Sequence, residues 1–244
     1  MDLELIRISK LLSEKGLCSR READQFIQQG WVKVDGQVVR ELGSRARRDQ
    51  KIELNNQASV IQSSKKTVIL HKPIGYISHY DDAKKYKPAL SLIDRNNFFG
   101  DEKKLPKKLV LTGMAPAGRL DIDSTGLLVL TQDGVIAKKI IGEQSNVEKE
   151  YLVRVEGDLS GDDLQRLNHG LSLDEKKLKP AKVFWQNQNQ LSFTLIEGRY
   201  RQIRRMCELV GLKVLSLKRV RIGQVRLASL PLGRWRFMDN KEFF

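Results

Sequence analysis

The sequence predicts an α+β protein of two domains: a small N-terminal module of helices and a hairpin, followed by a larger domain on a mixed, mostly antiparallel sheet. Three observations support this. The first 55 residues contain two short helical patterns and a hairpin signature, residues 56–66 are polar and lack periodicity, and short strand patterns predominate from Thr67 onward. Many strands with few helices between them favour an α+β fold around one large sheet. We therefore expect domains at residues 1–62, which include a linker, and 63–244.

The charge of the chain indicates a polyanionic partner. The 244 residues carry a formal net charge of +14, which points to nucleic acid or an anionic membrane surface. Residues 201–244 hold eleven basic and three acidic residues, whereas residues 111–200 hold eleven basic and thirteen acidic ones. This distribution suits a polyanion that basic segments hold and a near-neutral centre acts on.

Three other classes of protein are disfavoured by the sequence. No stretch reaches the ~18–20 apolar residues that cross a bilayer, and the start MDLELIRISK does not resemble a signal peptide, so we expect a cytoplasmic protein. Cys18 and Cys207 are the only cysteines and lie far apart, and His71, His79 and His169 are scattered. Neither a disulfide framework nor a metal site is therefore expected.

Local signals predict the N-terminal module. Ile8 and Leu11 begin a helical spacing that ends at Gly16, and Ser19 is the predicted N-cap of a second helix over residues 20–29. In VKVDGQVV an Asp-Gly pair lies between two β-branched runs, which is typical of a type I′ hairpin, and the short strand KIEL follows.

The run IRISKLLSEKGLCSRREADQFIQQGWVKVDGQVV, residues 6–39, resembles the S4 RNA-binding module. The resemblance implies that two helices and a hairpin present one basic face to RNA. The alternative is that these basic residues only solvate a small domain. Backbone amides after the N-cap could also hold a phosphate. The positions that match RNA-facing positions of the family are Arg7, Lys10, Ser19, Arg20, Arg21 and Lys33.

The stretch GRLDIDSTGLLVLTQDG, residues 118–134, places charges inside an otherwise apolar segment. Arg119, Asp121 and Asp123 alternate with apolar residues, so in an extended backbone they share one face. We predict a strand up to Asp123, a tight turn, and a second, buried strand that ends at an Asp-Gly turn. Carboxylates in such a place mark either a functional site or a structural ion pair.

Two other kinds of site share features with this stretch, and both are disfavoured. An EF-hand loop could begin at Asp121, but its twelfth position would be Gln132, where calcium needs a bidentate Glu. The string DIDST also resembles the aspartate motif of haloacid dehalogenase-type phosphatases. In those enzymes a strongly apolar strand precedes the motif, and Gly118-Arg119-Leu120 does not supply one.

The segments on either side of the central stretch read as follows. TVILHKPIGYIS is a buried strand broken by a Pro-Ile-Gly turn. Residues 81–109 are rich in lysine, and we expect Phe98, Phe99 and Leu105 to dock them on the protein. A solvated surface loop is favoured for this segment over an RNA-contacting insertion.

Strands are predicted at residues 150–156, 191–196 and 213–227, with helices at 159–167 and 201–210. The last helix has a clear apolar stripe and Gly211 after its end, which leaves Arg201, Arg204 and Arg205 near its other faces. Guanidinium groups in such a place hold phosphates or clamp carboxylates. For Arg205, a position on a solvated helix face is as much expected as a functional contact. A lone tyrosine such as Tyr151 belongs more often to a hydrophobic core than to a catalytic site.

Five ordered motifs resemble those of the RsuA/RluF-type pseudouridine synthases, which act on ribosomal RNA. These are HKPIGYIS, AGRLDIDSTGLLVLTQDG, EKEYLVRV, EGRYRQIRRM and PLGRWR, and they follow the S4-like module in the same order. The resemblance implies an essential catalytic Asp121, an Arg119 that fills the space of a flipped base, a Tyr151 that stacks on that base, and an Arg204 that pairs with the aspartate. We also expect RNA contacts from Arg199, Arg201 and Arg205.

The reaction implied by this family breaks the bond between N1 of a uridine and its ribose, turns the uracil, and joins C5 to the ribose. The resemblance implies no metal, nucleotide or redox cofactor, and we expect a monomer whose substrate is ribosomal RNA. Large-subunit RNA is favoured, but small-subunit RNA stays open, as does whether Asp121 attacks or deprotonates the ribose. A non-catalytic RNA-binding or ribosome-assembly protein is the alternative. Asp123 is expected to cap the turn by bonding backbone amides.

Overall fold

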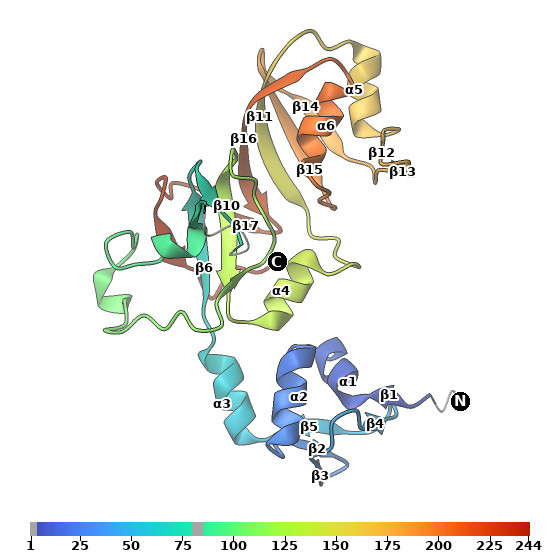
Figure 1. Ribbon diagram of the computed structural model, residues 1–244, viewed down its shortest axis with the longest axis vertical. Coiled ribbons are helices and arrows are strands. Elements are labelled where there is room, and N and C mark those ends of the chain that lie inside the picture. The colour runs from blue at the N-terminus through green and yellow to red at the C-terminus, as the bar shows by residue number, and fades with distance from the viewer. Residues whose placement is uncertain (1–3, 80–84) are drawn as a thin grey trace.

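The computed structural model describes residues 4–79 and 85–244. The N-terminal module lies at one end of the molecule, and a larger domain with one long sheet makes up the rest (Figure 1). The elements of the module are β1 (Ile6–Arg7), α1 (Ile8–Glu14), α2 (Arg20–Gln28), β2 (Val32–Val34), β3 (Gln37–Val39), β4 (Arg45–Ala46) and β5 (Ile52–Leu54).

Local predictions in this module are confirmed. The Ser19 side chain accepts a hydrogen bond from the backbone N–H of Glu22, and the Glu22 carboxylate accepts one from the N–H of Ser19, so a capping box begins α2. Asp35 and Gly36 have φ angles of 49° and 83°, as a type I′ turn requires, and β2 and β3 pair on either side of them. Both helices cover the small sheet with one apolar core.

The linker predicted after this module contains a helix that the sequence analysis did not predict. Residues Asn56–Ser64 form α3, whose N-cap Asn55 accepts a hydrogen bond from the N–H of Ala58. Only Ala58 of this helix is buried, whereas Val60 and Ile61 are exposed. An N-cap is enough to begin a helix that has no apolar stripe, and periodicity alone therefore missed it.

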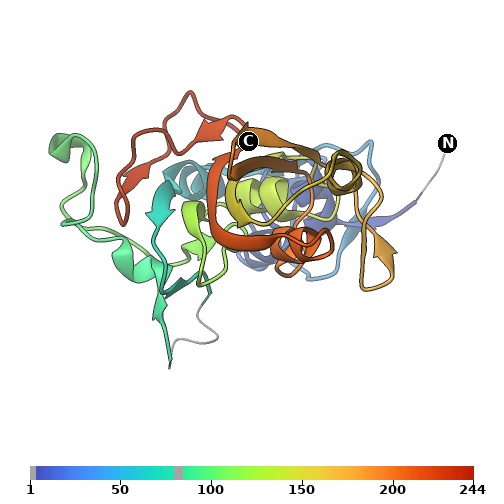
Figure 2. The same ribbon diagram turned by 90° about the horizontal axis from the view of Figure 1, so that it is seen from above.

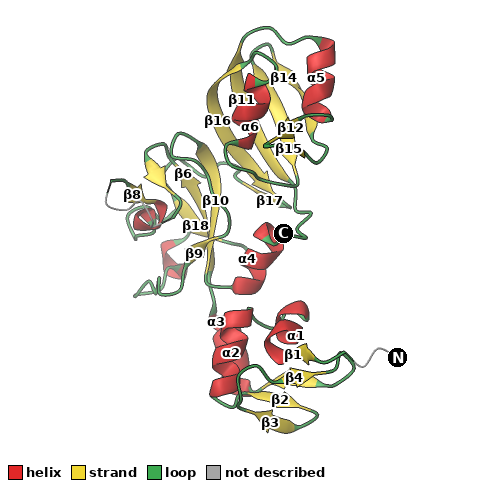
Figure 3. Ribbon diagram, turned by 45° about the vertical axis from the view of Figure 1, so that its right-hand side comes forward, coloured by secondary structure: helices red, strands yellow, loops and turns green. Residues whose placement is uncertain are grey.

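One nine-stranded sheet organises the larger domain, and the predicted fold class is confirmed. Its strands follow the order β14-β15-β11-β16-β10-β6-β18, while β17 pairs with β16 and β9 with β10 (Figure 3). All pairings are antiparallel except that of β10 with β16. The bounds are β6 (Thr67–Lys72), β9 (Ala115–Pro116), β10 (Thr125–Thr131), β11 (Lys149–Glu156), β14 (Lys182–Asn187), β15 (Gln190–Leu195), β16 (Lys213–Ile222), β17 (Val225–Arg226) and β18 (Trp235–Phe237).

The two halves of the sheet meet at a short parallel contact between β10 and β16. Only Thr125 with Lys218 and Gly126 with Arg219 are paired there. A Cβ atom on Gly126 would lie 2.2 Å from the carbonyl oxygen of Arg219, so only glycine allows this approach. The loop that carries Asp121 leads directly into this contact.

Three helices cover the sheet. They are α4 (Gly134–Ile141), α5 (Gly161–Asn168) and α6 (Gln202–Glu208), and they contact β10, β14 and β16 respectively. The predicted helices near residues 159–167 and 201–210 are thereby confirmed, whereas α4 was missed. The Asp133-Gly134 pair is not a turn between strands, because the Asp133 carboxylate caps α4 by accepting from the N–H of Val135.

Residues 119–123 do not form the predicted strand. They are a loop with a turn at Ile122 and Asp123, and β10 begins only at Thr125. This loop is anchored from the side by the Pro-Ile-Gly turn: the N–H of Gly75 donates to the carbonyl of Ile122 at 2.9 Å. Alternation over five residues is too short to decide between a strand and such a loop.

The lysine-rich segment lies at the edge of the larger domain, far from the N-terminus in the view from above (Figure 2). Residues 80–84, which include its first part, are outside the described residues. Leu105 is buried and Phe98 packs on Trp235 with ring centroids 4.9 Å apart, as expected of docking residues. Phe99 is 43% exposed, so that part of the prediction was wrong. Short elements here are β7 (Tyr76–Ile77), β8 (Lys87–Pro88), η2 (Ala89–Leu92) and η3 (Glu102–Lys104).

The N-terminal module contacts the larger domain through α4. The Lys138 ammonium donates to the carbonyl and the hydroxyl oxygen of Ser13 at 3.2 and 3.1 Å. At the end of α3, Lys65 pairs with Glu22 of the capping box. Within residues 4–79 and 85–244, no helix is both long and apolar enough to span a bilayer.

Candidate active site

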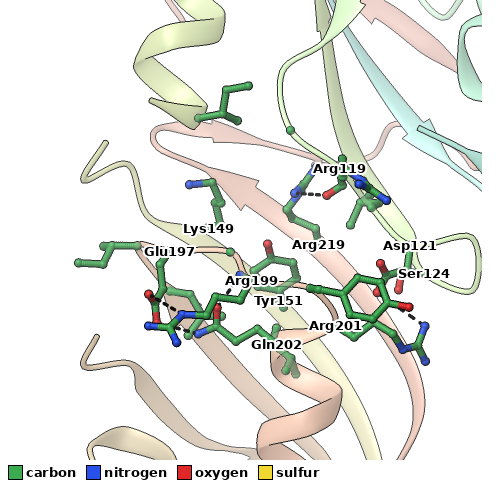
Figure 4. A pocket seen from close by; sticks show the side chains of 18 of the residues that line it. Arg119, Asp121, Ser124, Lys149, Tyr151, Glu197, Arg199, Arg201, Gln202 and Arg219 are labelled. Atoms are coloured by element: carbon green, nitrogen blue, oxygen red, sulfur yellow. Dashed lines mark hydrogen bonds and ion pairs between the residues drawn. The ribbon is translucent and has the colours of Figure 1, made fainter. Parts of the chain in front are cut away.

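A cavity of about 610 Å³ opens where the two halves of the sheet meet (Figure 4). Its walls are the loop 118–124, the strands β11 and β16, the end of α4, and the segment 195–204 that leads into α6. Ligand pockets in proteins typically have this size. The motifs that the sequence analysis singled out at Asp121, Tyr151 and Arg201 all contribute to this one cavity.

Asp121 lies on the cavity wall in a loop whose backbone is fixed by hydrogen bonds. The Ser78 hydroxyl accepts from the N–H of Leu120 and lies 2.9 Å from its carbonyl, to which it donates. The N–H of Ser124 donates to the carbonyl of Asp121 at 3.1 Å. These bonds fix the backbone on both sides of the carboxylate, whose side chain keeps 29% of its surface exposed.

The pairing of Arg204 with Asp121 was predicted wrongly. Nη2 of Arg204 lies 3.2 Å from Oδ2 of Asp123 and 3.2 Å from the Asp123 carbonyl oxygen. Arg201 is the arginine beside Asp121, with Nη1 at 3.9 Å from Oδ2, and it also pairs with Asp123 at 3.2 Å. Because the chain turns at Ile122, Asp123 faces α6 and takes the arginines that were assigned to its neighbour.

Asp123 is an ion-pair acceptor and does not cap the turn as expected. Burial by itself would raise its pKa, but the hydrogen bond from Arg201 and the charges of Arg204 and Arg201 lower the pKa below its ordinary value. Arg201 adopts a left-handed conformation with φ 48°, which costs an L residue about 1 kcal/mol or more. The carboxylate therefore holds a strained residue in place at the start of α6.

Tyr151 is 8% exposed and lies opposite Arg219 in the pairing of β11 with β16. The Arg219 guanidinium carbon lies 5.9 Å from the centre of the Tyr151 ring, within cation–π range. Nε of Arg219 donates to the carbonyl of Leu127 at 2.8 Å, and Nη1 donates to that of Arg119 at 3.2 Å. Arg219 thus contacts the Tyr151 ring, β10 and the loop 118–124, which is called the aspartate loop below.

Sequence reasoning missed Arg219 because alternating LKRVRIG reads as a strand with exposed basic residues. Its side chain is instead only 2% exposed. The Arg119 side chain, by contrast, is exposed at the cavity, while its backbone is held by Arg219. The role predicted for Arg119 stays a prediction.

Lys72 was also missed, although it lies in the quoted HKPIGYIS motif. The side chain is fully buried, and its ammonium donates to the carbonyls of Pro73 at 3.0 Å and Tyr76 at 2.8 Å. Burial lowers its pKa to about 8, against the opposing effect of the Asp121 and Asp123 carboxylates. Lys72 therefore fixes the turn that supports the aspartate loop.

The predicted RNA-binding residues of the N-terminal module do not share one environment. Arg7, Lys10 and Arg20 line a common shallow depression, whereas Lys33 lines a separate one. Arg21 is exposed. Ser19 is not available as predicted, because its hydroxyl caps α2 and its side chain faces Gly134 of the larger domain.

Arg199, just before α6, and Arg205, within α6, bind instead to the hairpin of β12 (Ser172–Leu173) and β13 (Lys176–Lys177). Arg205 forms a bidentate pair with Asp174 at 2.6 and 3.0 Å. Arg199 donates to three backbone carbonyls, those of Leu173, Lys176 and Lys177. Both guanidinium groups therefore have partners within the protein. The sequence did not predict these partners, because they lie in a hairpin distant in the chain.

No group of three or more His, Cys, Asp or Glu side chains within residues 4–79 and 85–244 is arranged to hold a metal ion. The side chains that line the cavity include the Asp121 carboxylate, the Tyr151 ring and several arginines.

Comparisons with known proteins assign both domains. Residues 66–209 match the family model of RNA pseudouridylate synthases, and residues 6–52 match the S4 domain. The chain belongs to the RNA pseudouridine synthase family. It is 34% identical over 239 residues to the dual-specificity RNA pseudouridine synthase RluF of Escherichia coli K12, covering 97% of this chain and 77% of that one.

Other relatives agree with this assignment. The ribosomal large subunit pseudouridine synthase B of Bacillus subtilis is 35% identical over 242 residues, which cover 97% of this chain and 93% of that protein. A crystal structure of a pseudouridylate synthase superposes with a TM-score of 0.64 at 28% identity and covers 96% of both chains. The protein is thus an RNA pseudouridine synthase, an isomerase, with an S4 RNA-binding domain.

Proposed function

We propose that this synthase converts a specific uridine of ribosomal RNA to pseudouridine, with Asp121 as the essential catalytic residue. Large-subunit RNA is the favoured substrate, because one relative is named for the large subunit. The observation that carries the proposal is the position of the Asp121 carboxylate on the wall of a cavity that Tyr151 also lines. We further propose that residues 1–62 bind RNA and residues 63–244 perform the reaction.

The target base must leave its stack to enter the cavity, at a cost of a few kcal/mol. Stacking on an aromatic ring returns about 1–3 kcal/mol, and Tyr151 offers such a ring beside the aspartate loop. The exposed Arg119 side chain, next to Asp121 in the chain, would fill the space that the base leaves in the RNA.

Within the cavity, Asp121 would act on the ribose while the N1–C1′ bond breaks. The electron pair of that bond stays on the uracil, which turns so that C5 can form the new bond to C1′. The proton of C5 is lost and N1 gains one, so the reaction needs no other reactant. Arg201, at 3.9 Å, places a positive charge beside the carboxylate, and Asp123 keeps Arg201 in position.

The test is site-resolved mapping of pseudouridine in ribosomal RNA from cells with and without the gene, using carbodiimide-dependent reverse-transcriptase stops. We expect one stop to disappear, the wild-type gene to restore it, and D121N to leave it absent. If every stop persists and the purified protein modifies no naked ribosomal RNA, the proposal fails and a non-catalytic RNA-binding role is favoured.

A further inference from the structure

The cavity has a second end, away from Asp121, whose side chains the reaction described above does not use. In Figure 4, Lys149 lies on the other side of Tyr151 from Asp121 and Ser124. Lys149 begins β11, two residues before Tyr151, so both side chains point to the same face of the strand. Their backbones are about 7 Å apart along the strand.

Lys149 is a buried cation with few partners. The residue is 8% exposed, and the one hydrogen bond of its side chain within the described residues goes from Nζ to the carbonyl of Val147 at 3.0 Å. An ammonium has three N–H donors, so two are free for another acceptor. A buried charge normally has an ionic partner, because transfer from water is otherwise costly.

Two other cations, Arg219 and Lys179, line the cavity with Lys149. The positive charges that act on it are those of Arg219 and Lys179, and burial together with these charges lowers its pKa to about 8. Arg219 is also buried, and its Nη2 has no hydrogen-bond partner. Two buried cations beside one cavity repel each other, which destabilises the unliganded protein and favours an anion between them.

Carboxylates near Lys149 are already engaged. Glu148 and Glu150 both pair with Arg221, at 3.1 and 2.7 Å. Glu197 lines the cavity, but its carboxylate pairs with Arg199 and accepts from the N–H of Lys179 at 3.0 Å. These three acids are paired elsewhere, and Glu143, which also lines the cavity, is exposed to solvent. An anion from outside would therefore find the buried positive charge of Lys149 uncompensated.

We propose that Lys149 is the centre of a phosphate-binding subsite inside the cavity, supported by the charges of Arg219 and Lys179, that holds a phosphodiester flanking the target uridine. This rests on the proposed function, since an RNA strand whose base stacks on Tyr151 carries a phosphate on each side of that nucleoside. A phosphodiester has one negative charge and two free oxygens, which can accept hydrogen bonds from the two N–H donors of Lys149 that have no acceptor among the described residues. Fixing this phosphate would set how far the nucleotide enters the cavity.

Mononucleotides test the subsite without knowledge of the target RNA. Uridine, uridine 3′-monophosphate and uridine 5′-monophosphate would be titrated into the full-length protein, with binding followed by saturation-transfer NMR. We expect one of the two nucleotides to bind about tenfold more tightly than uridine, the size of a charge-assisted hydrogen bond. K149M should remove this preference without weakening uridine, and K149R should retain most of it.

The matched control is K213M, because Lys213 is an exposed lysine on β16 outside the cavity that pairs with Glu156. It should leave the nucleotide preference unchanged. If K149M does not fold, as its melting curve would show, the neutral K149Q replaces it, and the comparison with K149R still isolates the charge.

Two results would overturn the proposal: nucleotides that bind wild-type protein no more tightly than uridine, or a preference that survives in the neutral variants. Failure of the proposed function would give a different result. In that case the nucleotide preference would still depend on Lys149, but mapping of ribosomal RNA would find no pseudouridine that depends on the gene.

Discussion

Gly126 is the position where a single methyl group should disturb the cavity most. A Cβ atom there would lie 2.2 Å from the oxygen and 2.5 Å from the nitrogen of the Arg219 backbone, and Gly126 has φ 112°. Backbone atoms cannot swing aside, so β10 and β16 must separate in G126A. The strained φ costs about 1–3 kcal/mol, and weakened hydrogen bonds between the strands add about 1 kcal/mol each.

We therefore expect G126A to destabilise the protein by about 3–5 kcal/mol, which lowers Tm by about 6–20 °C in a domain of this size. The control is G113A, since Gly113 also has positive φ, at 75°, but no atom lies within 4 Å of its Cβ position. G113A should therefore lose only the free energy that a positive φ costs an L residue, about 1–2 kcal/mol.

Thermal unfolding by circular dichroism compares the two variants. At temperatures where G126A is still folded, its pseudouridine formation should also be lower than that of G113A, because Arg219 holds the carbonyl of Arg119. Equal Tm values for G126A and G113A would refute the argument that the β10–β16 contact requires glycine.

Three further predictions follow from single side chains. D123N should lower Tm at pH 7, because the Asp123 carboxylate stabilises Arg201. Folding lowers the pKa of Asp123, so this stabilisation is present above about pH 4 and lost below it. The difference in Tm between D123N and wild type should therefore shrink on acidification, and a growing difference would contradict this. K149M should raise Tm at pH 7 but not at pH 10.5. The pKa of Lys149 is about 8 in the folded protein, so the buried charge destabilises the protein below pH 8, and this cost disappears as the pH rises toward the unfolded-state pKa of 10.5. Equal gains in Tm at both pH values would contradict this. R20A should weaken RNA binding and reduce its salt dependence by about one phosphate contact, whereas R205A, whose partner is an aspartate, should change neither in a filter-binding titration.

Features set by neighbouring residues were predictable from the sequence. The N-cap at Ser19 and the Asp-Gly hairpin need only a few consecutive residues, and both formed as expected. The helix after Arg201 had a full apolar stripe, and α6 begins one residue later than predicted. The family motifs also identified the enzyme class, since their order survives in sequence.

Partners between distant segments were not predictable. Arg204 and Arg201 meet Asp123 because of one turn at Ile122, and alternation gave the wrong geometry there. Arg219 looked exposed, because a sequence does not reveal that β16 is covered on the side where its guanidinium lies. The occupancy of Arg205 by Asp174 likewise depends on a hairpin that the sequence analysis did not find.

The central claim is that Asp121 performs the isomerisation in a specific ribosomal RNA. The most direct measurement is incubation of purified wild-type protein and of D121N with unmodified large- and small-subunit ribosomal RNA transcripts, followed by pseudouridine mapping. The account predicts one new stop with wild-type protein, in the large-subunit transcript, and none with D121N, although both bind that transcript with similar affinity. A stop formed equally by D121N would contradict the claim.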